Sequence, residues 1–143
     1  MTEKNILIRA IKQNDMDAVI DLLQLVSEFK PSKFDFLSIW NRFYEQSHVH
    51  SLVAVMDNQI VGYGSIVIEK KIRGGKMGHI EDIVSHSLSR KIGIGKAVVD
   101  ALFKIAKENG CYKVALSCKE HNVEFYKNCN YEISGVAMQV FID

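Results

Sequence analysis

The chain has 143 residues, of which 48% are hydrophobic and 24% are charged, and its net charge is +1. This length suits one domain, and the composition is typical of a globular protein, which excludes a disordered chain and a coiled coil. Nucleic-acid-binding domains are usually far more basic than 18 Lys and Arg against 17 Asp and Glu. The longest apolar runs, such as residues 53–56, are far shorter than the roughly 20 residues of a membrane span.

The amino terminus and the cysteines favour a cytoplasmic protein without a metal. The first ten residues, MTEKNILIRA, lack the apolar core and cleavage site of a secretory signal. Cys111, Cys118 and Cys129 are odd in number and form no CxxC pair, which argues against a disulfide framework. A zinc site that includes His121 is an alternative, but zinc signatures use tighter paired spacings. We therefore expect no metal and interpret the cysteines as small buried thiols.

The first half of the chain predicts a strand, two helices and a hairpin. The strand covers residues 6–10, and Asp15 can cap the first helix. Apolar residues of this helix recur at helical spacing: Met16, Val19, Ile20, Leu23 and Val26. Pro31-Ser32 begins the second helix, with Asp35 at the capping-box position. The hairpin consists of residues 51–56, a turn at 57–59 and residues 60–69.

The second half predicts four more strands, over residues 77–85, 113–118, 131–134 and 137–142. A basic loop, residues 70–76, precedes them. One helix begins after Ser89 and is ended by Asn109-Gly110. A short helix covers residues 122–128, and Asn130 follows it as a left-handed cap residue. This order of elements predicts a mixed α/β fold, with one central sheet flanked by helices in a single domain over residues 1–143.

The most specific local feature is the segment Arg90-Lys91-Ile92-Gly93-Ile94-Gly95-Lys96, which follows a strand and opens a helix. Its two glycines let the backbone approach a ligand, and the N–H groups of a helix start attract anions. The segment is not a Walker loop, and it is not the dinucleotide fingerprint, because the third glycine is replaced by Val98. It predicts a pyrophosphate-binding loop; a plain glycine-containing helix start is the alternative.

This R-x-x-G-x-G pattern resembles the acyl-CoA motif of the GNAT superfamily of N-acetyltransferases, and the predicted order of elements is that of its fold. Within the superfamily, several segments resemble the glucosamine-6-phosphate N-acetyltransferases: IEKKI at 68–72, GHIEDI at 78–83, GCYK at 110–113, NVEFYK at 122–127, Gly135-Val136 and Met138-Gln139. The resemblance covers essentially the whole chain and is strongest from Ile68 onward. It implies direct acetyl transfer from acetyl-CoA to an amine, in a homodimer whose sites use residues of both chains.

The resemblance also implies how acetyl-CoA is bound. The strand backbone at Ile83, Val84 and Ser85 would bind the pantetheine. The residues that would surround the pyrophosphate are Lys91, Ile92, Gly93, Ile94, Gly95 and Lys96. Tyr126 would be the general acid for the leaving thiolate, and Asn122, four residues earlier, shares its helix face. The alternative role for Tyr126 is that of a buried aromatic side chain.

On the acceptor side, Glu81 and Asp82 are the candidate catalytic carboxylates. Neighbours on a strand point to opposite faces, so one carboxylate is expected to face the sugar and the other the fold or the water near the amine. Carboxylates accept hydrogen bonds from sugar hydroxyls and attract the ammonium of the substrate; a solvated acidic pair is the alternative. The resemblance further implies that Lys71 and Arg73 bind the phosphate of glucosamine 6-phosphate, and that Ser27, at the end of the first helix, and Ser117 contact the substrate. For Arg73, a solvated loop charge is the alternative.

Two positions depart from the family pattern and leave alternatives open. Ser117 replaces an Asp or Glu that orients the amine, and Phe141 replaces an arginine that reaches the phosphate in a relative. Glu120 is an alternative source of the missing carboxylate. The leading hypothesis is an enzyme of UDP-N-acetylglucosamine biosynthesis. The alternatives are the same chemistry on another small amine and a non-catalytic acyl-CoA-binding module, against which Tyr126 argues.

Overall fold

A computed structural model describes residues 5–86 and 92–143. In this part of the chain, a five-stranded sheet has the order β1-β2-β3-β4-β5. The strands are β1 (Leu7–Ala10), β2 (Val49–Met56), β3 (Gln59–Lys70), β4 (Lys76–Ser85) and β5 (Lys113–Leu116). The first four are antiparallel, whereas β5 is parallel to β4. The prediction of a mixed α/β fold on one central sheet is therefore confirmed.

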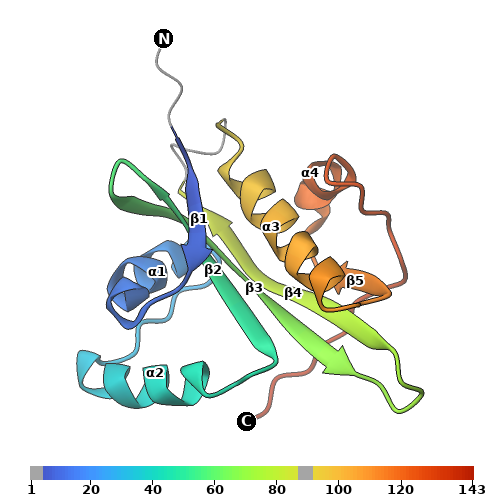
Figure 1. Ribbon diagram of the computed structural model, residues 1–143. Helices are drawn as coiled ribbons and strands as arrows, with labels where there is room; N and C mark the ends of the chain where they lie inside the picture. The colour runs from blue at the N-terminus through green and yellow to red at the C-terminus, as the bar shows by residue number, and fades with distance from the viewer. Residues whose placement is uncertain (1–4, 87–91) are drawn as a thin grey trace.

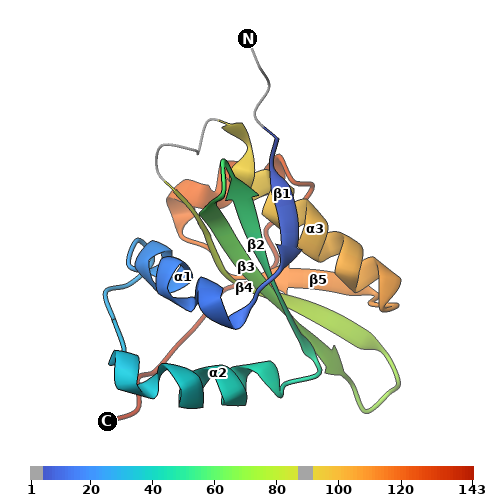
Figure 2. The same cartoon turned by 60° about the vertical axis from the view of Figure 1, so that its left-hand side comes forward.

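Helices lie on both faces of this sheet (Figures 1 and 2). The helices are α1 (Met16–Leu23), α2 (Phe36–Tyr44), α3 (Ile94–Glu108) and α4 (Val123–Lys127). Short 3-10 turns precede three of them: η1 (Gln13–Asp15), η2 (Lys33–Asp35) and η4 (Glu120–Asn122). Among the described residues, no helix combines the length and the apolar character needed to cross a bilayer.

Alternation along the strands produces two apolar layers. On β2, Leu52 and Ala54 join the layer under α3, and the intervening Val53 joins the layer under α1. The α3 layer contains Ile66 and Ile80 from β3 and β4, together with the fully buried Val98 and Leu102 of α3. The α1 layer contains Val19, Leu22, Val53, Tyr63 and Val84. Both faces of the sheet are thus buried, which fixes α1 and α3 relative to β4.

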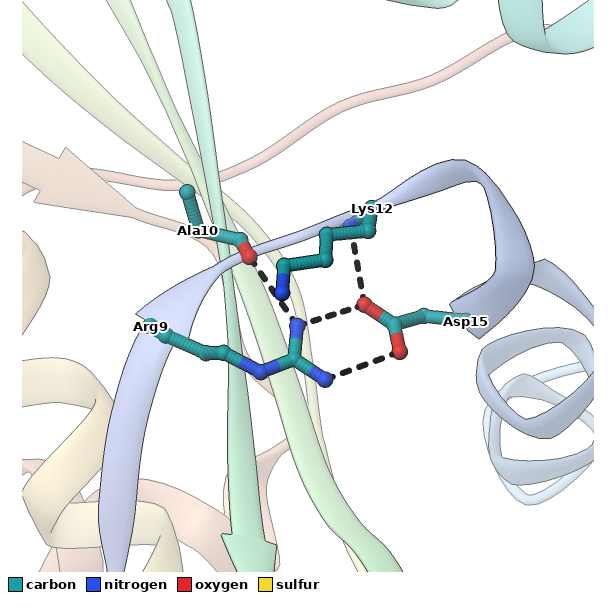
Figure 3. Close-up of polar contacts among 4 residues, drawn as sticks. All are labelled: Arg9, Ala10, Lys12 and Asp15. Atoms are coloured by element: carbon teal, nitrogen blue, oxygen red, sulfur yellow. Dashed lines mark hydrogen bonds and ion pairs between the residues drawn. The ribbon is translucent and has the colours of Figure 1, made fainter.

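An ion pair joins β1 to the start of α1 (Figure 3). The Arg9 guanidinium donates to the two carboxylate oxygens of Asp15 at 2.7 and 3.0 Å. The Lys12 backbone N–H donates to the same carboxylate at 2.8 Å. Asp15 is the N-cap residue of α1, as the sequence predicted, but its side chain makes no capping hydrogen bond to α1. Its carboxylate bonds back to Arg9 and Lys12 instead. The Arg9 hydrogen bonds hold the pKa of the buried Asp15 carboxyl below its usual value, against the opposing effect of burial.

The carboxyl-terminal segment corrects the sequence analysis. The predicted strands at 131–134 and 137–142 are absent from the described residues, and the prediction was wrong for a single chain. Val136, Met138, Val140 and Ile142 alternate as in a strand, yet each is at least 87% exposed. A strand needs a neighbour for its ladder of hydrogen bonds, and the segment pairs with no strand of residues 5–86 and 92–143.

Candidate active site

Three segments that were predicted to bind acetyl-CoA meet at one point. These are the end of β4, the start of α3 and helix α4. A Cβ atom built on Gly95 of α3 would lie 3.2 Å from Phe125 Cζ of α4 and 3.9 Å from Ser85 Oγ of β4. The absence of a side chain at Gly95 thus has a packing reason, the close approach of Phe125, besides the expected approach to a ligand.

A β-bulge reshapes β4 beside this point. Ser65 of β3 faces Glu81 and Tyr63 faces Val84, so that two β4 residues oppose Gly64. Asp82, the first of these two, has a left-handed backbone with φ of 56°. The bulge begins directly after Glu81, and both carboxylates are exposed. That Glu81 and Asp82 face opposite sides of the sheet stays a prediction.

Beyond the bulge, β4 has a free edge. Strand β5 pairs with β4 only from Met77 to Ile80. Within the described chain, the segment 81–85 therefore has a strand partner only on its β3 side. Backbone N–H and C=O groups on such an edge can pair with a ligand. This is the edge to which Ile83, Val84 and Ser85 belong.

The start of α3 has the features of an anion-binding helix terminus. Gly93 precedes the helix with φ of 82°, a conformation that favours glycine, and α3 begins at Ile94. The first N–H groups of a helix have no partner within it and carry a partial positive charge. Ile92 is exposed, and Lys91 lies outside the described residues. Lys96 donates to Asp100 at 2.6 Å, which raises the Lys96 pKa and offsets its charge.

Tyr126 is held on α4 between two aromatic rings. Its ring centre lies 4.9 Å from that of Phe125 and 6.1 Å from that of Tyr131, both in edge-to-face geometry. Burial raises the pKa of Tyr126 to about 12, with smaller effects from the nearby Cys118 and Cys129. The phenol is therefore protonated at neutral pH and is a hydrogen-bond donor. Asn122 is exposed at the junction of η4 and α4.

The predicted phosphate ligands lie far from this point. Lys71 and Arg73 belong to the turn between β3 and β4, where the Lys71 ammonium is 3.2 Å from Glu69 Oε1. The same oxygen lies 2.9 Å from His79 Nε2. From Glu81 to the β4 start at Lys76 is five residues, or roughly 17 Å at about 3.4 Å per residue. Within one chain, the structure does not bring Lys71 or Arg73 next to the candidate carboxylates.

The two serines of the predicted acceptor site lie in loops. The prediction that Ser27 ends the first helix was wrong. Helix α1 ends at Leu23, and a turn follows it. Ser117 follows the last residue of β5 and is exposed. Strand β5 is shorter than the prediction of 113–118, since its pairing ends with Leu116.

The sequence analysis missed a buried cluster of hydroxyl groups on the α1 face. Ser51 and Ser65 face each other on β2 and β3, and their hydroxyls are hydrogen-bonded. The Tyr63 hydroxyl lies 3.3 Å from Ser51 Oγ and 3.2 Å from Ser65 Oγ. Ser65 also faces Glu81 across β3 and β4, so this hydroxyl cluster lies next to the position of that carboxylate. The sequence signal that could have indicated this cluster is the presence of one serine in each of two neighbouring, largely apolar strands.

The cysteines are only partly as predicted. Cys129 is buried, Cys111 is partly buried and Cys118 is exposed. No group of three or more His, Cys, Asp or Glu side chains that could hold a metal ion occurs among residues 5–86 and 92–143.

Comparison with known protein families gives a direct match. Residues 18–131 match the acetyltransferase (GNAT) family. A glucosamine 6-phosphate N-acetyltransferase of Dictyostelium discoideum is 36% identical over 99% of this chain and 94% of its own length. Another, of Arabidopsis thaliana, is 38% identical over 71% of this chain and 70% of its own length.

Solved structures have the same fold. The crystal structure of glucosamine-6-phosphate N-acetyltransferase from Arabidopsis thaliana superimposes with a TM-score of 0.88 at 31% identity, covering 97% of this chain and 99% of that one. A Trypanosoma brucei acetyltransferase superimposes with the same TM-score at 27% identity, covering 96% of this chain and 100% of that one. A predicted acetyltransferase of Clostridium acetobutylicum with acetyl-CoA, 19% identical and covering 96% of each chain with a TM-score of 0.72, shares the fold.

Proposed function

This chain belongs to the acetyltransferase (GNAT) family, and from that premise we propose that it acetylates glucosamine 6-phosphate. The products are N-acetylglucosamine 6-phosphate and CoA, on the route to UDP-N-acetylglucosamine. The observation that carries the proposal is the convergence of the β4 bulge, the glycine-containing start of α3 and the protonated Tyr126 in a chain 36% identical to a relative named for this reaction.

Acetyl-CoA is proposed to bind along the free edge of β4 and the start of α3. The backbone of Ile83, Val84 and Ser85 would hydrogen-bond the pantetheine, as an added strand would. The N–H groups at Gly93, Ile94 and Gly95 point their positive end at the pyrophosphate. Ile92, Lys91 and Lys96 complete the proposed loop, with Lys96 weakened as a ligand by its ion pair with Asp100. Asn122 would contact the cofactor from the α4 side.

The proposed reaction is a direct attack of the neutral amine on the acetyl carbonyl carbon. Glu81 and Asp82 attract the substrate and accept hydrogen bonds from the sugar, and the amine proton passes to solvent through one of them. When the tetrahedral intermediate collapses, the C–S bond breaks and the thiolate leaves. The Tyr126 hydroxyl donates to that sulfur. Since a thiol has a pKa of about 8.5 and Tyr126 one of about 12, Tyr126 stabilises the thiolate by hydrogen bonding more than by complete proton transfer.

A homodimer with shared sites is proposed for the acceptor side. Its first support is the distance of Lys71 and Arg73 from Glu81 in one chain. Its second is the exposed, alternating apolar segment 136–142, which has the pattern of a strand and no strand partner among the residues that the structure describes. A second copy could supply the missing strand neighbour and bring its own Lys71 toward the phosphate.

We further propose that the chain acts as a single domain over residues 1–143 in the cytoplasm, with Ser27 and Ser117 at the sugar.

A different small amine is the second candidate substrate, favoured by Ser117 and Phe141. Ser117 has no charge to orient an amine, and Phe141, 84% exposed, cannot pair with a phosphate. The deciding experiment measures thiol release from acetyl-CoA with glucosamine 6-phosphate, free glucosamine and spermidine at equal concentrations. We expect the highest kcat/KM for glucosamine 6-phosphate. A higher value for either other amine would replace the proposed substrate, and binding of acetyl-CoA without turnover of any amine would indicate a binding module.

A further inference from the structure

The turn after α1 is closed by one side chain, that of Gln24. Its Nε2 donates to the Ile20 carbonyl at 2.9 Å and to the Phe29 carbonyl at 2.7 Å. Its Oε1 accepts from the Phe29 backbone N–H at 2.9 Å. Both ends of the amide are thus used, and the Gln24 side chain pairs with the Phe29 backbone as a neighbouring strand would.

These hydrogen bonds restrain the far end of the loop, at Phe29. At its near end, the Leu25 and Val26 N–H groups donate to the Leu22 and Leu23 carbonyls at 3.0 and 2.9 Å, and Lys30 pairs with Asp21 at 2.9 Å just beyond Phe29. Leu25, Val26 and Phe29 are 55%, 45% and 73% exposed, so apolar packing contributes little to holding the loop. The Ser27 N–H donates to the Leu23 carbonyl at 3.1 Å, which ties the middle of the loop to the end of α1. Gln24 closes the loop at its far end, and Ser27 lies inside the closed segment.

The loop begins beside the strand that carries the candidate carboxylates. Leu22 packs in one cluster with Val84 and Tyr63, and Leu23 packs against that cluster. Val84 lies on β4, just beyond the bulge at Asp82. The end of α1 is therefore anchored on the face and strand of the proposed acceptor site, and Gln24 is the next residue.

We propose that Gln24 is a positioning residue for the acceptor: it holds the loop 25–29 in one conformation, so that Ser27 is presented to the aminosugar without first having to be ordered. The inference rests on the proposed function. A loop that is ordered before binding avoids the conformational entropy cost of ordering it in the complex. The effect should fall on acceptor binding and not on acetyl-CoA.

The test compares Gln24→Leu with Gln46→Leu. Leucine fills a similar volume and removes all three hydrogen bonds of Gln24. Gln46 also donates to a backbone carbonyl, that of Phe43 at 3.2 Å, in an exposed position outside the proposed site. For Gln24→Leu we expect the KM for glucosamine 6-phosphate to rise about three- to tenfold, with the KM for acetyl-CoA unchanged. For Gln46→Leu we expect neither constant to change.

A second readout does not depend on the substrate. Hydrogen exchange of the Phe29 amide, whose acceptor is Gln24 Oε1, should quicken in Gln24→Leu and stay as in the wild type in Gln46→Leu. Unchanged exchange would overturn the role of Gln24 in closing the loop, and faster exchange with an unchanged acceptor KM would overturn its link to the acceptor. If the wild type does not acetylate glucosamine 6-phosphate, the proposed function fails, and exchange alone decides whether Gln24 holds the loop. Gln24→Glu replaces Gln24→Leu if the latter does not fold. It keeps an acceptor for the Phe29 N–H but turns a carboxylate oxygen toward the Ile20 and Phe29 carbonyls, so the acceptor KM should rise in this variant as well.

Discussion

The two ends of β4 differ in how completely other elements of the same chain pack around them. At the Ser85 end, β4, α3 and α4 are in contact through Gly95 and Phe125, over a layer that includes the fully buried Ile94 and Val98. At the Lys76 end, the turn 71–75 projects from the sheet, and no helix or strand of the described chain pairs with the segment 136–142 (Figure 1). The first end is packed within the chain and the second is open.

As proposed, the two substrates depend on different levels of structure. Binding of acetyl-CoA would use contacts that form when one chain folds. Binding of the phosphorylated acceptor, as proposed, needs a second copy to bring Lys71 near Glu81. Variants can therefore separate the two ends.

The largest effect is expected from breaking the proposed dimer. Met138→Asp combined with Val140→Asp places two charges on one face of the exposed apolar segment. We expect monomers in analytical ultracentrifugation and a loss of acetyl transfer of more than about 100-fold, or roughly 2.7 kcal/mol. Acetyl-CoA affinity, measured by calorimetry, should change less than about twofold. Gln139→Asp, at the alternate position, is the control; full activity in a monomeric double variant would show that one chain suffices.

Tyr126→Phe tests the packed end. Phenylalanine keeps the edge-to-face contacts with Phe125 and Tyr131 and removes only the hydroxyl. Because the hydroxyl acts on the developing thiolate, kcat should fall about 10- to 100-fold with little change in either KM. Steady-state kinetics give the result, and the melting temperature serves as the folding control. A wild-type kcat would leave Tyr126 as a packing residue only.

A third variant tests the Arg9–Asp15 ion pair, which joins β1 to the start of α1. Helix α1 covers the sheet face between the two ends of β4. Asp15→Asn should lower the free energy of unfolding by roughly 2 kcal/mol at pH 7, because it removes the charge of the buried Asp15 from its pair with the partly buried Arg9. In the wild type, the lowered Asp15 pKa stabilises the fold above the pKa of the unfolded state, and this contribution is lost as the pH falls through the folded pKa. Urea titrations of both proteins should therefore converge toward acidic pH; a constant difference would contradict the assigned pair.

The sequence predicted the packed end better than the open end, for a physical reason. Three signals were local: the residue types of the strand 51–56, the helical period after Ser89 and the left-handed Asn130. They depend on residues close in the sequence, and the structure has each of these features. The bulge at Asp82 was missed because it depends on the register with β3. The strands at 131–134 and 137–142 were predicted wrongly because alternation reports apolar faces and does not show which chain covers them. Gln24 was missed because its bonds join side chain and backbone across a turn.

The next smaller effect is expected from Lys71→Ala, which tests the open end. The side chain is partly exposed and paired with Glu69, so each of its ion pairs is modest. We expect the KM for glucosamine 6-phosphate to rise about fivefold, or roughly 1 kcal/mol, with the KM for acetyl-CoA unchanged. Lys70→Ala, one residue earlier, is the matched control. A rise in the acetyl-CoA KM alone would place Lys71 at the other ligand.

The smallest effect is expected from Tyr131→Phe, at the packed end. Among the described residues, the Tyr131 hydroxyl is buried without a hydrogen-bond partner, and burial raises its pKa to about 12. An unpaired buried hydroxyl costs about 1–3 kcal/mol, part of which the phenyl ring of the variant recovers without leaving a cavity. The ring contact with Tyr126, at 6.1 Å between centres, is kept.

We therefore expect Tyr131→Phe to stabilise the protein by about 0.5–1 kcal/mol, measured as a higher urea midpoint with an unchanged slope. Its kcat should equal that of the wild type, whereas Tyr126→Phe lowers kcat: the two variants remove the same atom from adjacent rings, one beside the proposed leaving group and one inside the fold. A destabilised Tyr131→Phe would mean that a buried water satisfies the hydroxyl. A lowered kcat would transfer the role of the acid, at least in part, from Tyr126 to Tyr131.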